Sequence, residues 1–310
     1  MVFIHQDIEG SLPKQQVGSC VLPCCFFYIF LTEKEHKYLK GLDIMKNTKI
    51  IAIANQKGGV GKKTTAANLG AALQRSGFET LLIDFDPQGS LSRKYMQYVY
   101  TEETVTINEL MKSVIAKTET DVSKAILHNN LNNIDYIAAD IRFSEMEMTL
   151  VNTRCRETVL QRLLKKCSLD YDYIVIDCPP FLGNLLYNAL TAADYVLIPV
   201  AAQEMAIDGI PLLLDTIDDV CENTNSDLEI AGVIPTLVEK TKMSQAVIEE
   251  LSEYFNDKLI GYVSKSTAAR DSSKEGLALC QYKHNTANKY KNKLAEEYAN
   301  IANEIVHITR

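Results

Sequence analysis

The sequence has no surplus of positive charge. It contains 32 Lys and Arg residues against 40 Asp and Glu residues, which gives a formal net charge of -8. A protein that coats nucleic acid over its whole surface needs the opposite balance, so the composition disfavours that class. A local basic patch on an acidic body remains compatible with these numbers.

Closely spaced cysteines are scarce in the body of the chain. No pair there has the C-x2-C spacing of a zinc site, so we expect reduced thiols, as in a cytosolic protein. Three further cysteines lie close together near the N-terminus, but no neighbouring residue completes a ligand set for a metal. The single cysteines are Cys155, Cys167, Cys178, Cys221 and Cys280, and the grouped ones are Cys20, Cys24 and Cys25.

A hydrophobic run long enough to span a bilayer is also missing near the N-terminus. The apolar run at residues 17–31 contains Pro23, is shorter than the roughly 20 residues needed, and has no signal-peptide flanks. It is a membrane-touching segment, a packing extension, or a stretch translated from a misplaced start. We favour the third, because Met45 is followed by polar residues and then an apolar strand. We therefore divide the chain into an extension, residues 1–44, and one domain, residues 45–310.

From Lys49 onward, short apolar runs alternate with helical stretches. The runs are rich in Ile, Val and Leu, which is typical of parallel strands buried on both faces. The alternation predicts an α/β fold, with a doubly wound, mostly parallel sheet of about eight strands and helices on both faces. Predicted strands cover residues 50–54, 80–85, 134–138, 173–177, 195–200, 229–234 and 259–263; predicted helices include residues 64–75, 157–166, 184–192, 210–222, 244–255 and 286–305.

A loop rich in glycine and lysine follows the first predicted strand. It opens a predicted helix, which is the context that a phosphate-binding loop requires. Glycines let backbone N–H groups turn toward a phosphate, and the helix N-terminus adds a partial positive charge. Lys62 is spaced to reach the β- and γ-phosphates. The loop reads Lys57-Gly58-Gly59-Val60-Gly61-Lys62-Lys63-Thr64-Thr65.

Aspartates stand at the ends of two further strands. Asp84 and Asp86 end the second strand, and Asp177 ends the fourth. Carboxylates at the C-terminal ends of parallel strands face the crevice where ligands bind. In a phosphate-loop enzyme they hold the Mg²⁺ shell and the attacking water. One acidic strand end is usually a solvated cap, but two behind a glycine loop indicate a nucleotide site.

Four strings in the sequence resemble the ParA/MinD group of deviant Walker ATPases: NQKGGVGK, IDFDPQG, YDYIVIDCPP and AADYVLIPV. The resemblance extends from Lys46 to the C-terminus, and the strings are highly specific in combination. It implies a P-loop NTPase that hydrolyses ATP with Mg²⁺ as a cofactor. It also implies a homodimer that forms on ATP binding and encloses the nucleotides between two protomers.

The resemblance also implies roles for single residues. Lys57 is similar to the signature lysine that reaches the partner's phosphates, and Lys62 to the ordinary Walker lysine. Asp86 is similar to the residue that positions or activates water. Asp84 and Asp177 are similar to members of the magnesium shell. The other residues expected to bind the cofactor are Gly58, Gly59, Val60, Gly61, Lys63, Thr64 and Thr65.

Position 63 departs from the pattern of this group, which has a Thr or Ser whose hydroxyl binds magnesium. Here the position is Lys63, and Thr64 follows one place late. An ammonium group cannot ligate a cation, although it can neutralise phosphate charge. Shifting the register by one residue does not restore the pattern. If Lys63 were the Walker lysine, Lys62 would stand where the loop needs a glycine. We expect nucleotide binding to survive and hydrolysis to suffer, unless Lys63 points away and Thr64 supplies the hydroxyl.

Within the group, the sequence most resembles the ParA branch. Its last predicted helix is too acidic for the membrane-binding helix of MinD-like proteins, so we expect no stable membrane association. The resemblance implies a cytoplasmic, nucleoid-associated switch that partitions plasmid, chromosome or mobile-element DNA and is stimulated by a ParB-like protein. The alternative is a nucleotide-binding scaffold that hydrolyses ATP poorly because of Lys63.

Basic residues concentrate in the last quarter of the chain, where the ParA resemblance implies non-specific DNA binding. The main candidates are Lys265, Arg270 and Lys274, although any single lysine is most often a solvated surface charge. The Pro-Arg-Asn usual in this branch appears here as Ser264-Lys265-Ser266, which leaves adenine recognition by this loop open. Further candidates are Lys240, Lys242, Lys283, Lys289, Lys291 and Lys293.

Overall fold

A computed structural model describes residues 48–119, 121–165, 171–203, 207–282 and 289–310 of the chain, and in the last helix the side chains from residue 293 onward. Residues 1–44 lie outside this range, so the predicted division at residue 45 stays a prediction. No helix in the described ranges is both long enough and apolar enough to cross a membrane.

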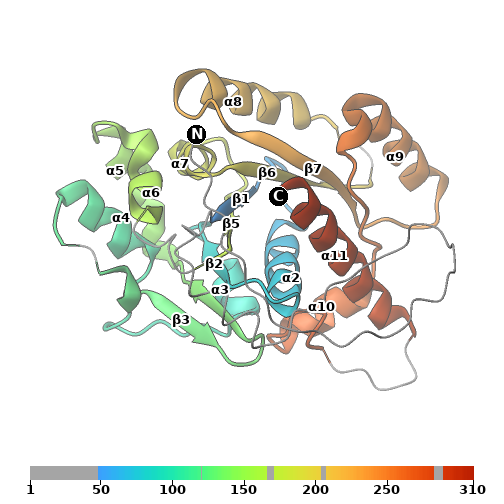
Figure 1. The fold of residues 1–310 in the computed structure, drawn as a ribbon, viewed down its shortest axis with the longest axis horizontal. Coiled ribbons are helices and arrows are strands. Elements are labelled where there is room, and N and C mark those ends of the chain that lie inside the picture. Colours follow the sequence, from blue (N-terminus) through green and yellow to red (C-terminus); the bar gives the residue numbers. More distant parts are fainter. Residues whose placement is uncertain (1–47, 120, 166–170, 204–206, 283–288) are drawn as a thin grey trace, which may run out of the picture. The chain divides into compact units, whose positions relative to one another are not determined.

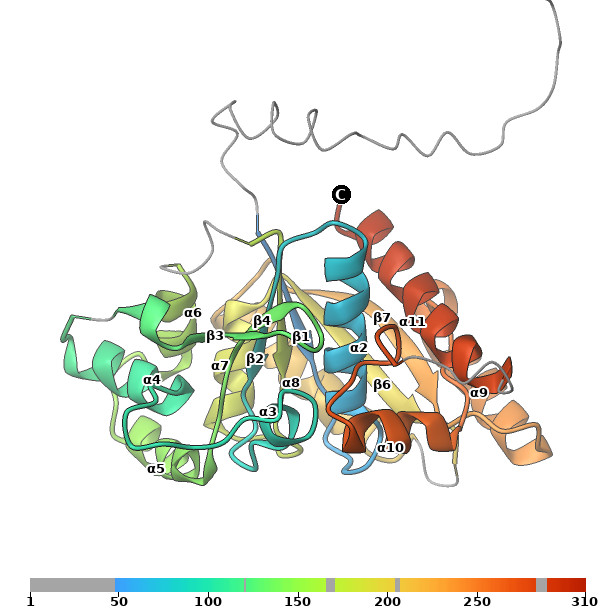
Figure 2. The ribbon, with the colours of Figure 1, turned by 90° about the horizontal axis from the view of Figure 1, so that it is seen from below.

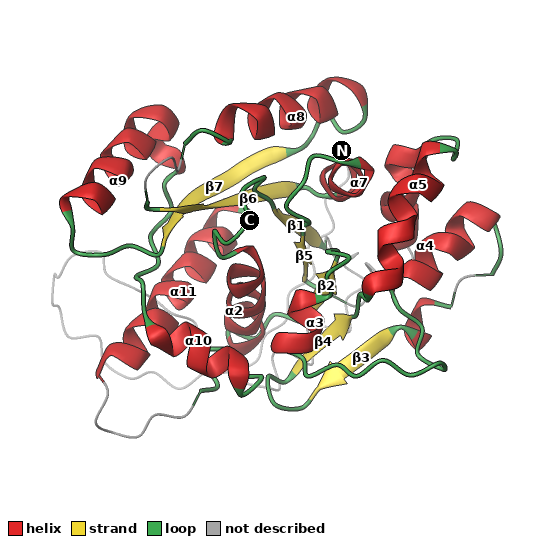
Figure 3. Cartoon of the chain, turned by 180° about the vertical axis from the view of Figure 1, so that it is seen from behind, coloured by secondary structure: helices red, strands yellow, loops and turns green. Residues whose placement is uncertain are grey.

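The centre of the fold is a seven-stranded sheet with the order β3-β4-β2-β5-β1-β6-β7. Every neighbouring pair is parallel except β3 and β4, so the predicted doubly wound, mostly parallel sheet is confirmed (Figure 3). The strands are β1 (Lys49–Ile53), β2 (Thr80–Asp84), β3 (Ile126–Asn129), β4 (Ile134–Ile137), β5 (Tyr173–Asp177), β6 (Tyr195–Ala201) and β7 (Glu229–Thr236).

The predicted strand at residues 259–263 is wrong. That segment makes only isolated bridges, including one between Leu259 and Val233, and Gly261 interrupts it with a φ of 147°. The sheet therefore has one strand fewer than the expected eight-strand class, even with the unpredicted β3 included. β3 has four residues, most of them partly exposed, which leaves too short an apolar pattern to read from the sequence.

Helices cover both faces of the sheet (Figures 1 and 2). Buried side chains of α2, α10 and α11 form a cluster on one face, and those of α4 to α9 form a cluster on the other. The helices are α2 (Lys62–Arg75), α3 (Ser90–Lys94), α4 (Ile107–Ala116), α5 (Met146–Val151), α6 (Val159–Leu164), α7 (Asn184–Ala192), α8 (Ile210–Asn223), α9 (Lys242–Phe255), α10 (Thr267–Lys274) and α11 (Lys289–Ile308).

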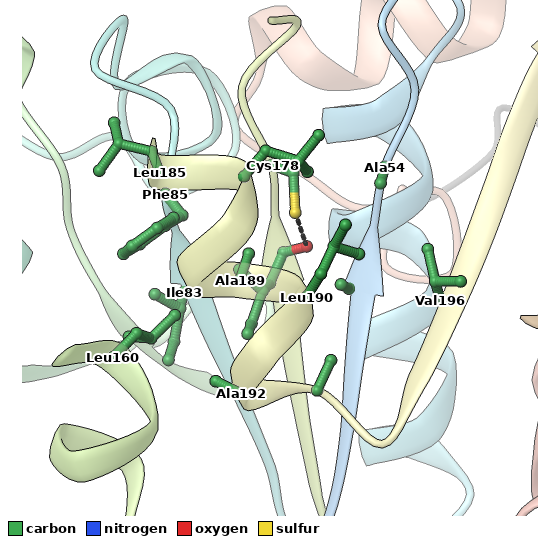
Figure 4. Close-up of a cluster of buried hydrophobic side chains, with 14 of the residues drawn as sticks. Ala54, Ile83, Phe85, Leu160, Cys178, Leu185, Ala189, Leu190, Ala192 and Val196 are labelled. Carbon is green, nitrogen blue, oxygen red and sulfur yellow. Dashed lines mark hydrogen bonds between the residues drawn. The ribbon is translucent and has the colours of Figure 1, made fainter. Parts of the chain in front are cut away.

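Helix α7 packs over the strand ends that carry the predicted carboxylates. Leu185 and Ala189 on this helix are fully buried, and Figure 4 shows them beside Cys178, the residue after β5. The Cys178 thiol points to the Ile176 carbonyl oxygen, with 3.8 Å between sulfur and oxygen. This apolar layer holds the end of β5 in place, and so it holds Asp177.

Candidate nucleotide-binding site

A cavity of about 250 Å³ opens at the C-terminal edge of the sheet, where β1 leads into α2. This edge of a doubly wound sheet is the ordinary place for a ligand. The cavity gathers the glycine loop, the start of α2 and residues that follow β2 and β5. Its lining consists of Gly58, Gly59, Gly61, Lys62, Lys63, Thr64, Asp86, Ser90, Asp177, Cys178 and Pro180.

The first turn of α2 has no capping side chain. Its N-cap is Gly61, whose φ of 94° lies in the left-handed region that glycine adopts without strain, and no acidic residue stands in the first turn. Thr236 at the end of β7 holds the loop by donating a hydrogen bond to the Val60 carbonyl across 2.7 Å. The N–H groups at this helix start therefore remain for an anion such as a phosphate.

Lys62 is the first residue of α2, and its side chain turns back into the loop. The ammonium donates to the carbonyl oxygens of Asn55 and Lys57, at 2.7 and 3.1 Å. Burial lowers the pKa of Lys62, and the nearby charge of Asp177 opposes that shift. This geometry matches a phosphate-loop lysine and fits the register in which Gly61, rather than Lys62, makes the turn.

Asp84 and Asp177 are direct neighbours in the register of β2 and β5, and both are buried. Asp84 accepts hydrogen bonds from the Ser92 N–H and hydroxyl, at 2.8 and 2.7 Å, whereas Asp177 Oδ1 has no partner. Burial raises the pKa of Asp84 to about 7. Burial, together with the charges of Asp84 and Asp86, raises the pKa of Asp177 well above its ordinary value.

Lys63 is one of the residues that line the cavity. Burial lowers the pKa of Lys63, the ammonium of Lys94 lowers it further, and Asp177 and Asp86 oppose these effects. Thr64 also lines the cavity, and its Oγ1 accepts a hydrogen bond from the Tyr95 hydroxyl at 3.3 Å. Position 63 therefore brings a lysine, not a hydroxyl-bearing residue, to the cavity lining.

The structure gathers most, but not all, of the predicted site residues at the cavity. Thr65 faces the other way, because its buried hydroxyl shares a hydrogen bond with Tyr298 of α11 at 3.3 Å. Val60 and Asp84 lie behind the lining, and Lys57 follows Asn55 with its N–H on the Asn55 side chain at 2.8 Å. The roles of these residues in binding and catalysis stay predictions.

Several residues at the site were not singled out from the sequence. Asn55 and Thr236 hydrogen-bond to the loop, Tyr95 to Thr64, and Ser92 to Asp84, whereas Lys94 acts on Lys63 through its charge. Ser92, Lys94 and Tyr95 belong to the short segment after the IDFDPQG string, so proximity to that string was the available signal. Thr236 comes from a strand far along the sequence, and only the register of the sheet brings it to the loop.

At one position, Lys63, the site departs from the magnesium site that the resemblance implies. Octahedral Mg²⁺ needs oxygen ligands, and Lys63 stands where the hydroxyl is required. The described residues contain no group of three His, Cys, Asp or Glu side chains placed to hold a metal ion. Asp177 Oδ1 is a buried acceptor still without a partner. One carboxylate oxygen is thus available to a cation while the hydroxyl ligand is missing, so Mg²⁺ would depend on the phosphates of a bound nucleotide and on water for its other ligands.

The three main DNA candidates lie on or just before α10. This helix lies near the end of the sheet where α2 begins (Figure 2). Lys265, Arg270 and Lys274 are all exposed, and Arg270 and Lys274 share one face of the helix because four residues separate them. Lys265 pairs with Glu239 at 3.0 Å. Lys283 and the side chains of Lys289 and Lys291 lie outside the described residues.

A family described as AAA domain matches residues 48–230. Over 260 residues, 83% of this chain and 97% of the relative, the chain is 34% identical to the chromosome-partitioning ATPase Soj of Treponema pallidum. It is 42% identical over 212 residues, 68% of this chain and 81% of the relative, to the sporulation initiation inhibitor protein Soj of Bacillus subtilis. The chain belongs to the ParA/Soj family of partitioning ATPases.

Solved structures agree with membership of the ParA/Soj family. A plasmid partition protein of Borrelia burgdorferi bound to AMPPNP has a TM-score of 0.69 at 27% identity, over 84% of this chain and 99% of that one. A cobyrinic acid a,c-diamide synthase of Mycobacterium smegmatis, with bound ADP and magnesium, has a TM-score of 0.68 at 30% identity, over 84% and 94%. The ParA/Soj fold therefore also occurs in a protein that is named for a different activity.

Proposed function

We propose that the chain is an ATP-dependent dimerising switch that partitions plasmid, chromosome or mobile-element DNA. The observation that carries the proposal is the cavity at the end of β1. There an uncapped helix start, the buried Lys62 and Asp177 surround a space of about 250 Å³. Such a cavity suits a polyphosphate, and the ParA/Soj relatives supply the link to partitioning.

Each part of the site has a role in this proposal. The loop amides of Gly58 to Gly61 and the ammonium of Lys62 hold the β- and γ-phosphates of ATP. Asp86, at the cavity wall, positions the attacking water. Asp84 and Asp177 are the predicted magnesium shell, and Lys63 reduces what the metal contributes.

Lys57 serves a second set of phosphates in the dimer, because Lys62 already serves the first. ATP should therefore dimerise the protein, and Lys57→Ala should weaken the dimer. The measurement is light scattering with a slowly hydrolysed ATP analogue. Lys112→Ala, which removes an exposed lysine on α4, is the matched control. A monomer–dimer balance that is unchanged in Lys57→Ala would remove the cross-subunit role.

The loaded dimer binds DNA through basic side chains around α10, and a ParB-like protein stimulates hydrolysis and resets it. Phosphate contacts by lysine and arginine do not depend on base sequence. The proposal implies a cytoplasmic, nucleoid-associated protein without stable membrane association. It also implies that residues 45–310 are sufficient, so a chain lacking residues 1–44 should bind nucleotide with unchanged affinity.

A second candidate is a nucleotide-loaded scaffold that binds DNA but hydrolyses ATP poorly. The observation that favours it is Lys63, which lines the cavity where the family has a Thr or Ser. Both candidates predict ATP-dependent DNA binding. They differ in turnover, which a phosphate-release assay with and without DNA measures.

A further inference from the structure

Two buried asparagines join elements of the nucleotide cavity to the segment that follows α10. We call this segment, residues 275–279, the α10 exit. Asn68 lies on α2 and is 2% exposed, and Asn132 lies in the turn between β3 and β4 and is 1% exposed. Neither residue is part of the cavity lining. Both are therefore placed to act through other residues rather than on a bound nucleotide.

Asn68 bridges the first turn of α2 and the α10 exit. Its Nδ2 donates a hydrogen bond to the Thr64 carbonyl oxygen at 2.7 Å, and its Oδ1 accepts one from the Leu279 N–H at 2.7 Å. Thr64 lines the cavity, immediately after the two lysines that begin the helix. One side chain thus connects the start of α2, where phosphates bind in the proposed site, with the α10 exit.

Asn132 bridges the residue after α3 and the same α10 exit. Its Nδ2 donates to the carbonyl oxygens of Tyr95 and Gly276, at 3.0 and 2.9 Å, and its Oδ1 accepts from the Ala278 N–H at 2.7 Å. Tyr95 is also the residue whose hydroxyl donates to Thr64 Oγ1. A second route therefore leads from the cavity lining to the α10 exit.

The α10 exit is in turn hydrogen-bonded to α10 itself. The Gly276 N–H donates to the Ser273 carbonyl oxygen at 3.3 Å, and the Leu277 N–H donates to the Ser272 carbonyl oxygen at 2.9 Å. Leaving a buried amide without a partner costs free energy, so buried hydrogen bonds of this kind tend to be kept when the elements that they join are displaced. The two asparagines therefore favour movement of α2, the end of α3 and α10 as a connected set.

We propose that Asn68 and Asn132 are positioning residues that couple nucleotide binding to DNA binding within one protomer. The inference rests on the proposed function, because it takes the cavity to be the ATP site and α10 to be part of the DNA surface. Phosphates on the loop amides displace the first turn of α2, and the two asparagines pass this displacement to the basic residues of α10. Since such coupling is reciprocal, DNA also raises the affinity for nucleotide.

Fluorescence anisotropy of a labelled DNA duplex, with and without an ATP analogue that has a non-hydrolysable β–γ bridge, measures this coupling in the full chain. The variants are Asn68→Ala and Asn132→Ala. Asn68→Ser is a milder change, because a serine hydroxyl can bond to the carbonyl four residues earlier and so loses only the bond to the α10 exit. Asn188→Ala is the matched control, since this buried amide bridges Leu160 and Arg156 on the face of the sheet opposite α10. Calorimetry measures the Kd of the analogue, and melting curves establish that each variant is folded.

In the native chain the analogue should tighten DNA binding, and DNA should tighten analogue binding by the same factor. The variants of Asn68 and Asn132 should lower this factor by about fivefold, while the Kd of the analogue without DNA stays close to native. Asn188→Ala should keep the native factor. Light scattering with the analogue should show that all variants still dimerise.

A native factor in folded Asn68→Ser and Asn132→Ala, or an equal loss in Asn188→Ala, would overturn the coupling but leave the proposed function. Loss of the dimer in the variants of Asn68 and Asn132 would show that they act on the interface between protomers, which would also overturn the coupling within one protomer. A native chain whose DNA affinity does not respond to the analogue would overturn the proposed function itself.

Discussion

The hydroxyl of Tyr95 donates a hydrogen bond to Thr64 Oγ1 across 3.3 Å. Tyr95 is 1% exposed, and burial raises the pKa of its phenol, so it stays a protonated donor. Position 63 lacks the hydroxyl of the family pattern. Of the two threonines that follow, only Thr64 could supply a hydroxyl to the cavity, because the Thr65 hydroxyl faces α11. The Thr64 hydroxyl is thus hydrogen-bonded to the residue that directly follows α3.

Removing the Tyr95 hydroxyl tests whether the Thr64 hydroxyl has a structural role or binds the metal ion. Tyr95→Phe should lower the free energy of unfolding by about 1 kcal/mol, the usual contribution of one such hydrogen bond. It should leave the magnesium response of phosphate release unchanged, since Thr64 is not a metal ligand in our account. Tyr298→Phe removes the matching bond at Thr65 and is the control. Magnesium-stimulated release that appears only in Tyr95→Phe would show that Thr64 can supply the ligand.

Asp177 makes stability without ligand depend on pH. Burial and the neighbouring carboxylates raise its pKa in the folded protein, so ionisation is unfavourable there and costs stability as pH rises above about 4. Asp177→Asn has no carboxylate to ionise at this position. The melting temperature of the variant, relative to the native chain, should therefore increase from pH 5 to pH 8.

Thermal melts without nucleotide measure this difference. The exposed Asp257→Asn is the control for the loss of one carboxylate from the surface. Asp177→Asn should also lose the increase in melting temperature that nucleotide gives the native chain. An Asp177→Asn variant that is less stable than the native chain at pH 8, yet more stable at pH 5, would reverse the predicted sign.

Much of this fold could be predicted because apolar strands and the loop are local patterns. Tyr173–Asp177 and Asn184–Ala192 match the predicted bounds residue for residue. The segment at residues 259–263 has the apolar pattern of a strand, but it lies beside β7 without forming a ladder. The loop and its carboxylates were visible in the sequence, but the hydrogen bond from Tyr95 to Thr64 depends on how α3 folds back.

DNA binding should depend on the basic residues around α10. Neutralising Lys265, Arg270 and Lys274 together should weaken ATP-dependent binding on all DNA sequences and flatten its salt dependence, because fewer counterions are released. Fluorescence anisotropy with unrelated duplexes over a range of salt concentrations measures both effects. A control variant removes the same charge from three exposed lysines elsewhere, Lys112, Lys124 and Lys165. Equal loss in the two triple variants would show that net charge, rather than this surface, governs binding.

One measurement tests the role of Lys63 most directly: phosphate release by the native chain and by Lys63→Thr, with DNA, across a magnesium titration. Native release should be slow and respond weakly to magnesium. Lys63→Thr should release phosphate at least about tenfold faster and gain a clear magnesium dependence, because one electrostatic contact in phosphoryl transfer commonly contributes that much or more. Equal turnover in the two proteins, with the same magnesium midpoint, would contradict the account.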